Sequence, residues 1–188
     1  TEDADLCGLL VDDLPVRAQR IVLSAGAGTA DLLAGLGVSQ PTQQLRPLHM
    51  VLAKGPALKP LFAHCLGGGP KPRVTVTTHP AADGQWVWYL GGDLAEADGV
   101  ARDAAAQIQA AQREMASLLP WVDQSATQWT TLRVDRAEPA QSGLLRPDNA
   151  FLADQGRLLV GWPTKLALAP DLSERVCAAL QRDGIQPG

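Results

Sequence analysis

Short apolar runs followed by helical patterns occupy the two ends of the chain. Residues 21–23 are Ile-Val-Leu, and leucines at helical spacing follow over 29–36. Residues 157–160 are apolar after the initial arginine, and apolar positions then recur every fourth residue over 172–180. A buried strand that leads into an amphipathic helix gives this pattern in a parallel α/β layer. We therefore predict that both ends belong to one such layer.

β-Branched and aromatic residues dominate the middle of the chain. Residues 43–54 have the length and content of a long strand. The Val- and Thr-rich segment 73–79 and the aromatic segment 85–90 flank Asp83-Gly84, which is a strong signal for an antiparallel hairpin. Residues 127–134 are a further strand candidate. The middle is therefore predicted to form a mainly antiparallel sheet.

One amphipathic helix is predicted within this sheet region, ending at Pro120. Its apolar residues recur at spacings of three and four, which places them on one face that we expect to lie across the sheet. They are Val100, Ala104, Ile108, Ala111, Met115 and Leu118. Near the start of the chain, residues 6–11 and 16–18 predict two short strands around an acidic turn. The fold class expected from this order is α+β, with a mixed or antiparallel sheet, one long packed helix and end segments that complete an α/β layer.

Composition removes several classes of function. The chain has 188 residues and a net charge of −4, so it lacks the basic surface that nucleic acid or an anionic membrane would require. Its three cysteines are widely spaced and favour reduced thiols in a cytoplasmic protein. We expect no transmembrane segment, because no apolar run approaches the required length. The chain starts with Thr1 and enters a hairpin pattern almost at once, so we expect it to be a piece of a longer protein.

Familiar catalytic and metal motifs are incomplete. The glycine turn after residues 21–23 lacks the third glycine of a dinucleotide fingerprint, since Asp31 stands at that position. His49, His64 and His79 are about fifteen residues apart, without a close pair of ligands, so we expect no metal site. No serine stands in a nucleophile elbow, which argues against a hydrolase triad.

Two polar stretches remain as candidate sites. In the segment 131–139, period-two alternation places Arg133 and Asp135 on one strand face and Arg136 on the other. Surface ion pairs and capture of an anionic group by a guanidinium are both compatible with this pattern. In the segment 161–170, Lys165 precedes the start of a helix, where unpaired N–H groups favour negative charge on a ligand.

These stretches together resemble the FAD-dependent oxidoreductases of the D-amino-acid oxidase and glycine oxidase type, including glycerol-3-phosphate dehydrogenase-like members. The segment 21–26 resembles the strand that passes beside the cofactor, and 158–170 resembles the strand, loop and helix that face the flavin. The helix at 32–38, Pro41 and the segment 46–50 fit the family's order of elements.

The chain also departs from the family's motifs. Trp162-Pro163-Thr164-Lys165 replaces the usual glycine-rich flavin loop, and His49-Met50 stands where an arginine–glycine step is common. The amino-terminal glycine fingerprint that binds the ADP half of FAD is absent from the chain.

The resemblance implies three functional parts and a set of site residues. Residues 1–40 would be a remnant of the FAD-binding layer, 41–155 the substrate-binding sheet and helix, and 156–188 the flavin-facing strand, loop and helix. The implied cofactor-binding residues are Ala25, Gly26, Gly28, Gly161, Trp162, Pro163, Thr164 and Lys165. The implied substrate-binding residues are Arg133, Arg136, His49 and Tyr89; the resemblance assigns no catalytic residue.

The activity implied by the resemblance is oxidation of a small amine or hydroxyl substrate, such as an amino acid or a glycerol-3-phosphate-like molecule, by hydride transfer to FAD. The isolated chain is expected to be inactive, because the amino-terminal FAD-binding segment is missing. An apolar face that normally contacts that segment would be exposed and would favour self-association of the chain. The alternative is a non-catalytic domain of the same architecture that binds a small anion or a protein.

Overall fold

The chain is described by a computed structural model, and its described residues have the predicted α+β architecture, with four α-helices and with strands arranged in three sheets. The described ranges are 8–69, 71–140 and 149–186.

The chain divides into two compact units, and both boundaries fall inside long strands. Unit 1 comprises residues 1–46 and 136–188, and unit 2 comprises 47–135. The strands that cross the boundaries are β4 (Gln43–Lys54) and β8 (Gln128–Pro139). The functional parts expected from the sequence, with limits at 40 and 155, remain predictions.

The sheet of unit 1 joins the two ends of the chain. Its order is β3 (Ile21–Leu23), β10 (Leu158–Trp162), β9 (Phe151–Gln155). β3 and β10 are parallel, with Ile21 opposite Leu158, which confirms the predicted parallel layer. β9 was not predicted. It pairs antiparallel with β10 through a turn in which Gly156 has a positive φ of 68°.

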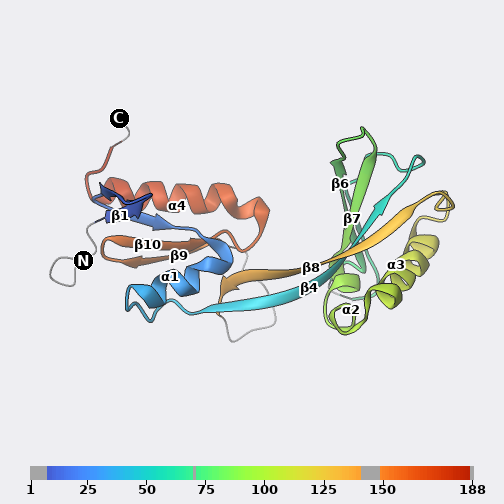
Figure 1. Ribbon diagram of the computed structural model, residues 1–188, viewed down its shortest axis with the longest axis horizontal. Coiled ribbons are helices and arrows are strands. Elements are labelled where there is room, and N and C mark those ends of the chain that lie inside the picture. The colour runs from blue at the N-terminus through green and yellow to red at the C-terminus, as the bar shows by residue number, and fades with distance from the viewer. Residues whose placement is uncertain (1–7, 70, 141–148, 187–188) are drawn as a thin grey trace. The chain divides into compact units, whose positions relative to one another are not determined.

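Helices α1 (Thr29–Gly35) and α4 (Ala169–Arg182) lie on opposite sides of this sheet (Figure 1). Leu33 of α1 packs in the cluster that contains Val160. On the other face, Leu172 of α4 packs over Gly161, where a Cβ would lie 2.8 Å from the leucine Cδ1. Both helices were predicted, and alternation along β10 explains why each meets a different face.

A separate hairpin precedes β3. Strands β1 (Gly8–Val11) and β2 (Leu14–Arg17) pair antiparallel around Asp12 and Asp13, which both have positive φ. This confirms the predicted pair of strands around an acidic turn. Its large apolar side chains are 43% to 69% exposed; they are Leu9, Leu10, Val11, Leu14 and Val16.

Unit 2 is built on a five-stranded sheet in the order β5-β6-β7-β4-β8. Strands β6 (Val74–Pro80) and β7 (Trp86–Gly91) form the predicted hairpin, with Val76 opposite Leu90. The edge strand β5 (Ala63–Cys65) pairs antiparallel with β6.

The single helix predicted from residue 100 is divided in the structure. After a 3-10 turn, η2 (Gly92–Ala95), come α2 (Asp98–Ala101) and α3 (Ala104–Leu118). The Asp103 carboxylate accepts a hydrogen bond of 2.8 Å from the Ala106 N–H and so caps α3. An aspartate cap satisfies backbone donors at a helix start, which explains the break. Val100 therefore belongs to α2 and not to the apolar stripe of α3.

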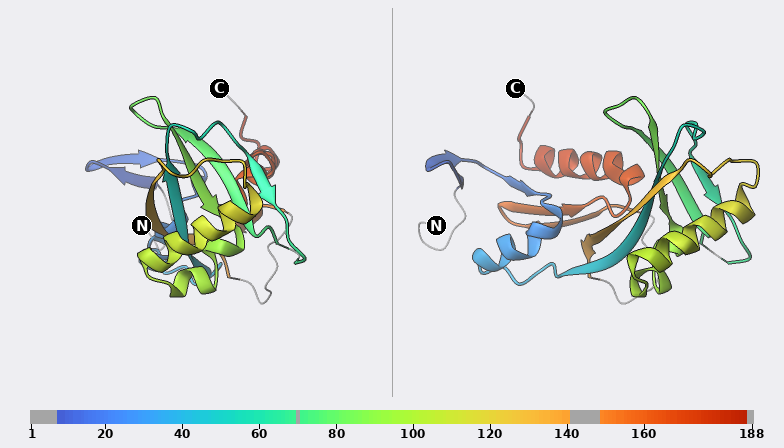
Figure 2. Two further views of the ribbon diagram at one scale, coloured as in Figure 1. Left: turned by 90° about the vertical axis from the view of Figure 1, so that its right-hand side faces the viewer. Right: turned by 45° about the vertical axis from the view of Figure 1, so that its right-hand side comes forward.

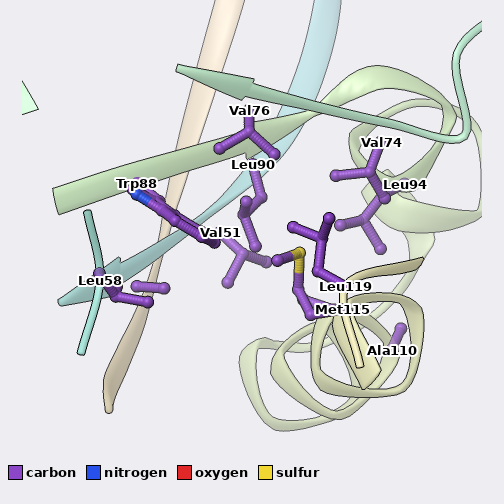
Figure 3. Packing of buried hydrophobic residues seen from close by; sticks show 12 residues of the cluster. Val51, Leu58, Val74, Val76, Trp88, Leu90, Leu94, Ala110, Met115 and Leu119 are labelled. Carbon is purple, nitrogen blue, oxygen red and sulfur yellow. The ribbon is translucent and has the colours of Figure 1, made fainter. Parts of the chain in front are cut away.

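Helix α3 runs along one face of the five-stranded sheet, as expected (Figure 2). Met115 extends from α3 toward Val51 of β4, and Leu90 lies beside them (Figure 3). These three residues are at most 1% exposed. Burial of these apolar side chains stabilises the sheet and the helix together.

Candidate functional site

The parallel pairing of β3 and β10 brings two predicted loops to one edge of the unit 1 sheet. Leu23 lies opposite Val160, so the chain leaves both strands at the same end. The first loop continues through η1 (Gly26–Gly28) into α1, and the second through residues 163–165 and η3 (Leu166–Leu168) into α4. Ligands bind at the carboxyl ends of parallel strands in open α/β sheets. This edge is therefore the first candidate site.

The glycine turn presents an open surface at this edge. Ala25 and Gly28 are exposed. A Cβ added at Gly26 or Gly28 would meet nothing within 4 Å, and Gly26 has a φ of 56°. Thr29 is fully buried, and its hydroxyl has no hydrogen-bond partner within the described part of the chain. Buried polar atoms without a hydrogen-bond partner are rare in native proteins.

Gly161 and Trp162 lie inside unit 1. Trp162 is 2% exposed and its ring packs on Phe151, with ring centroids 5.8 Å apart. Its indole N–H has no acceptor among the described residues. Leu172 of α4 packs closely over Gly161, and a Cβ there would require the leucine side chain to shift. Gly161 and Trp162 therefore support the loop at 163–165 through packing inside unit 1.

The residues after Trp162 form the surface of the second loop. Thr164 has a positive φ of 59°, and its hydroxyl donates to the Pro163 carbonyl at 2.7 Å. The backbone N–H of Lys165 also donates to the Pro163 carbonyl, at 2.6 Å. The next residue, Leu166, is 90% exposed.

The start of α4 contains a carboxylate that the sequence analysis did not consider. Asp171 accepts a hydrogen bond of 2.8 Å from the Ala150 N–H and one of 3.0 Å from Arg175. The Ala150 bond, and then the Arg175 bond, lower the pKa of the Asp171 carboxyl. A first-turn aspartate is a recognisable sequence signal, but its partner Ala150, just before β9, is not.

The predicted substrate residue His49 lies on the helix-covered face of unit 2. It is 1% exposed and alternates with the buried Val51 and Ala53 along β4. Its Nδ1 is 3.0 Å from the Gly99 carbonyl. The His49 side chain therefore holds α2 against β4.

Gln107 of α3 completes this buried polar network. Its Nε2 donates to the carbonyls of His49 and Leu94, at 2.7 and 2.8 Å. Its Oε1 accepts a hydrogen bond of 3.0 Å from Arg102. The side chain is fully buried with all these bonds made, so it joins β4, η2, α2 and α3.

The predicted arginines fall in different units. Arg133 of unit 2 donates from Nη1 to Val100 O at 2.9 Å and from Nη2 to Arg102 O at 2.7 Å, and so it holds the end of α2. Arg136 is half-buried in unit 1. Glu138, two residues on, is buried and forms an ion pair with Arg46. The placement of Arg133 and Arg136 on opposite strand faces remains a prediction.

The opposite face of the unit 2 sheet forms the second candidate site, which we call the open face. It consists of Met50, Leu52, Thr75, Thr77, Tyr89 and Gly91. Apart from Gly91, which is itself buried, these positions alternate with the buried ones along β4, β6 and β7, and α3 covers the other face. Gly91 lies opposite Thr75, and a Cβ there would approach the Thr75 hydroxyl at 2.9 Å and Met50 Cε at 3.0 Å. A glycine inside a central strand leaves room for a close approach.

Tyr89 is the predicted substrate residue that lies on the open face. Its ring packs against His79, with centroids 4.4 Å apart. Its hydroxyl has no hydrogen bond recorded within the described residues. Sequence reasoning missed Met50, Thr75 and Gly91, although the alternation around His49 would have identified Met50 as its outward-facing neighbour.

Neither a metal-binding cluster nor a membrane-spanning helix is found in the described ranges. No group of three or more His, Cys, Asp and Glu side chains there is arranged to hold a metal ion. No helix in those ranges is long and apolar enough to cross a bilayer. The pKa of the Cys65 thiol is raised, because burial outweighs the effect of nearby Arg73.

Comparisons with known proteins identify a close relative. No protein-family model matches the chain. The chain is 71% identical over 186 residues to a protein of Pseudomonas aeruginosa named a probable FAD-dependent oxidoreductase. The match covers 99% of this chain and 48% of that protein. The chain thus spans about half the length of the curated relative it matches.

Two solved structures share the fold. A crystal structure of an FAD-dependent oxidoreductase from Pseudomonas aeruginosa matches with a TM-score of 0.92 and 70% identity, over 100% of this chain and 52% of that one. A structure of L-amino acid deaminase from Proteus vulgaris matches with a TM-score of 0.58 and 13% identity, over 100% of this chain and 44% of that one. The second match shows similarity of fold alone.

Proposed function

We propose that this chain is part of an FAD-dependent oxidoreductase and supplies its substrate-binding sheet together with two loops that contact the flavin. The observation that carries the proposal is the parallel pairing of β3 with β10, which brings the glycine turn and residues 163–168 to one sheet edge. Identity of 71% to a probable FAD-dependent oxidoreductase supports it. The remaining half of the full-length protein would supply the glycine fingerprint for the ADP half of FAD.

The residues at the sheet edge fit the proposed cofactor. Open space beside Gly26 and Gly28 would admit a flat ring or a phosphate close to the backbone. The buried Thr29 hydroxyl would gain a partner there. Ala25 and the segment 161–165 complete the proposed FAD-binding set, in which Gly161 and Trp162 support the loop through packing.

FAD, when bound, accepts a hydride from a substrate C–H next to an amine or a hydroxyl group. The contribution of the protein is orientation and electrostatics. The Lys165 ammonium and the free N–H groups at the start of α4 would offset the negative charge of the reduced flavin. The negative charge of Asp171, at the same helix start, would repel the reduced flavin. Its hydrogen bonds from Ala150 and Arg175 make this repulsion weaker than that of a free carboxylate.

Tyr89 is the substrate-binding residue that the geometry of unit 2 supports best, because it lies on the open face. A small amine or hydroxyl substrate, such as an amino acid or a glycerol-3-phosphate-like molecule, would contact its hydroxyl. His49 and Arg133 would act indirectly, since both bind carbonyls of α2 or its end. Arg136 remains the proposed partner for an anionic substrate group.

The visible spectrum of the full-length protein tests the cofactor. A flavin spectrum supports the proposal, whereas colourless protein with a complete glycine fingerprint contradicts it and favours a non-catalytic binding domain. The 188-residue chain alone is expected to bind FAD weakly and to be inactive.

Lys165→Met tests the electrostatic role of the second loop. Loss of its charge is expected to lower the flavin reduction potential and to slow flavin reduction roughly 10-fold or more. Lys59→Met is the matched control, because Lys59 is exposed in unit 2. An unchanged potential and turnover in Lys165→Met would rule out the proposed role of the lysine.

A further inference from the structure

Unit 2 contains a charged cup that the proposed flavin reaction does not use. The cup has a volume of about 460 Å³ and lies between η2, α2, α3 and residues 71–73. Leu94 and Ala110, both labelled in Figure 3, are apolar lining residues that also belong to the core. Four basic and four acidic side chains complete the lining. A cavity of this size accommodates a small molecule.

Most of the basic side chains around the cup already have partners. Lys71 Nζ is 2.6 Å from Glu96 Oε2. Arg73 Nη2 is 2.8 Å from Glu114 Oε2. Arg102 donates a hydrogen bond to Gln107 Oε1. These contacts hold the walls of the cup together and occupy five of its charged and polar lining groups.

Charges of both signs remain for a ligand. Within the described part of the chain, the side chains of Arg113, Asp93 and Asp98 have no recorded hydrogen bond or ion pair, although all three line the cup. A guanidinium and two carboxylates at one cavity favour a ligand that carries both a carboxylate and an ammonium group.

The backbone beside Asp98 is strained. Ala97 also lines the cup and has φ 38° and ψ −103°, a conformation that costs a non-glycine residue about 1–3 kcal/mol. Hydrogen bonds from Gly99 N to Glu96 O at 2.7 Å and from Val100 N to Ala97 O at 3.0 Å hold this turn in place. Strained turns of this kind concentrate at ligand sites, where they fix side chains in advance of binding.

We propose that this cup binds a small zwitterionic molecule of the α-amino-acid type with an apolar side chain. Its carboxylate pairs with Arg113, its ammonium group with Asp93 and Asp98, and its side chain contacts Leu94 and Ala110. Arg113, Asp93 and Asp98 are exposed, so a simple anion would contact Arg113 alone and a simple cation the two carboxylates alone, whereas a zwitterion contacts all three. The inference is independent of the proposed function, because none of these residues belongs to the flavin edge or to the open face.

Calorimetric titration of the full-length protein, with and without FAD, tests the proposal. The probes are leucine, 4-methylpentanoate, which lacks the ammonium group, and 3-methylbutylamine, which lacks the carboxylate. Leucine is expected to bind at least ~10-fold more tightly than either analogue, because each analogue loses a charge-assisted contact. Equal affinity for an analogue, or no binding of leucine at millimolar concentration, would overturn the proposal.

Variants locate the binding. Arg113→Gln and Asp98→Asn are each expected to weaken leucine binding about 10-fold. Arg182→Gln, at an exposed arginine of α4 in unit 1, is the matched control and should leave the affinity unchanged. Unchanged affinity in both cup variants would assign the binding to another site and contradict the inference. The titration measures binding rather than turnover, so its failure leaves the flavin proposal intact.

Discussion

The two units differ in how far each covers its own apolar surface. In unit 2, α3 closes one face of the sheet, and Val51, Leu90 and Met115 are almost completely buried. In unit 1, the core around Leu158 and Val160 is smaller, while the β1–β2 hairpin keeps its large apolar side chains exposed. Similar apolar content in the sequence thus gives a closed core in one unit and an uncovered surface in the other.

The uncovered surface of unit 1 includes an apolar groove. It has a volume of about 320 Å³, lies between the hairpin, β3 and α1, and is lined mostly by apolar residues that include Leu10 and Leu32. Apolar surfaces of this kind mark interaction sites. Under the proposed function, the remainder of the full-length protein covers the groove; self-association of the 188-residue chain is the expected consequence when that remainder is absent.

Truncation of one leucine in each unit tests this difference most strongly. Leu90→Ala should lower the free energy of unfolding by about 2–5 kcal/mol, because it leaves a cavity in a closed core. Leu10→Ala, at a residue that is 69% exposed, should cost about 0.5 kcal/mol or less in the chain alone. Urea unfolding followed by circular dichroism measures both.

The same pair of variants in the full-length protein sharpens the result. If the remainder of the protein covers the hairpin, the cost of Leu10→Ala should rise there, while the cost of Leu90→Ala should not change. An equally small effect of Leu10→Ala in both forms would show that the hairpin remains exposed and would contradict the proposed covering.

A second comparison concerns the buried polar network of unit 2. Gln107→Leu removes the donors to the His49 and Leu94 carbonyls and should cost about 1–3 kcal/mol. Gln109→Leu, at an exposed glutamine on the same helix, is the control and should have little effect. Thermal unfolding distinguishes the two. Equal effects of the two variants would mean that the network does not hold α3 on the sheet.

Local periodicity was sufficient to predict most elements of the fold. The parallel layer was predicted from two apolar runs far apart in sequence, because fully apolar strands that lead into helices are characteristic of such layers. β9 was missed because its segment, Phe151–Gln155, is apolar at one end and polar at the other and shows no clear alternation. The division between α2 and α3 was missed because the apolar spacing continues across Asp103.

The candidate sites depend more on tertiary contacts and were harder to predict. His49 was selected for its chemistry, although alternation with Val51 and Ala53 already indicated a buried position. Arg133 was selected for its charge, but its bonds to carbonyls of α2 and Arg102 join residues more than thirty positions apart and leave no pattern in the sequence. The shared edge of the glycine turn and the Lys165 loop, by contrast, follows from the predicted parallel pairing.

The smallest expected effect concerns how α4 is attached in unit 1, compared with how α3 is attached in unit 2. Asp171 joins α4 to Ala150, just before β9, through a half-buried hydrogen bond, whereas α3 is held by buried apolar side chains. The pKa of Asp171 is lowered from 3.8 on folding, first by the Ala150 N–H and then by Arg175. Its contribution to stability is therefore present above the unfolded pKa and is lost as the pH falls through the lower folded value.

Asp171→Asn should reduce the urea midpoint of unit 1 at neutral pH, and the difference should disappear well below pH 3.8. Glu174→Gln, at an exposed residue on the same helix, is the control; a deficit in Asp171→Asn that persists in acid would assign the effect to packing instead of charge.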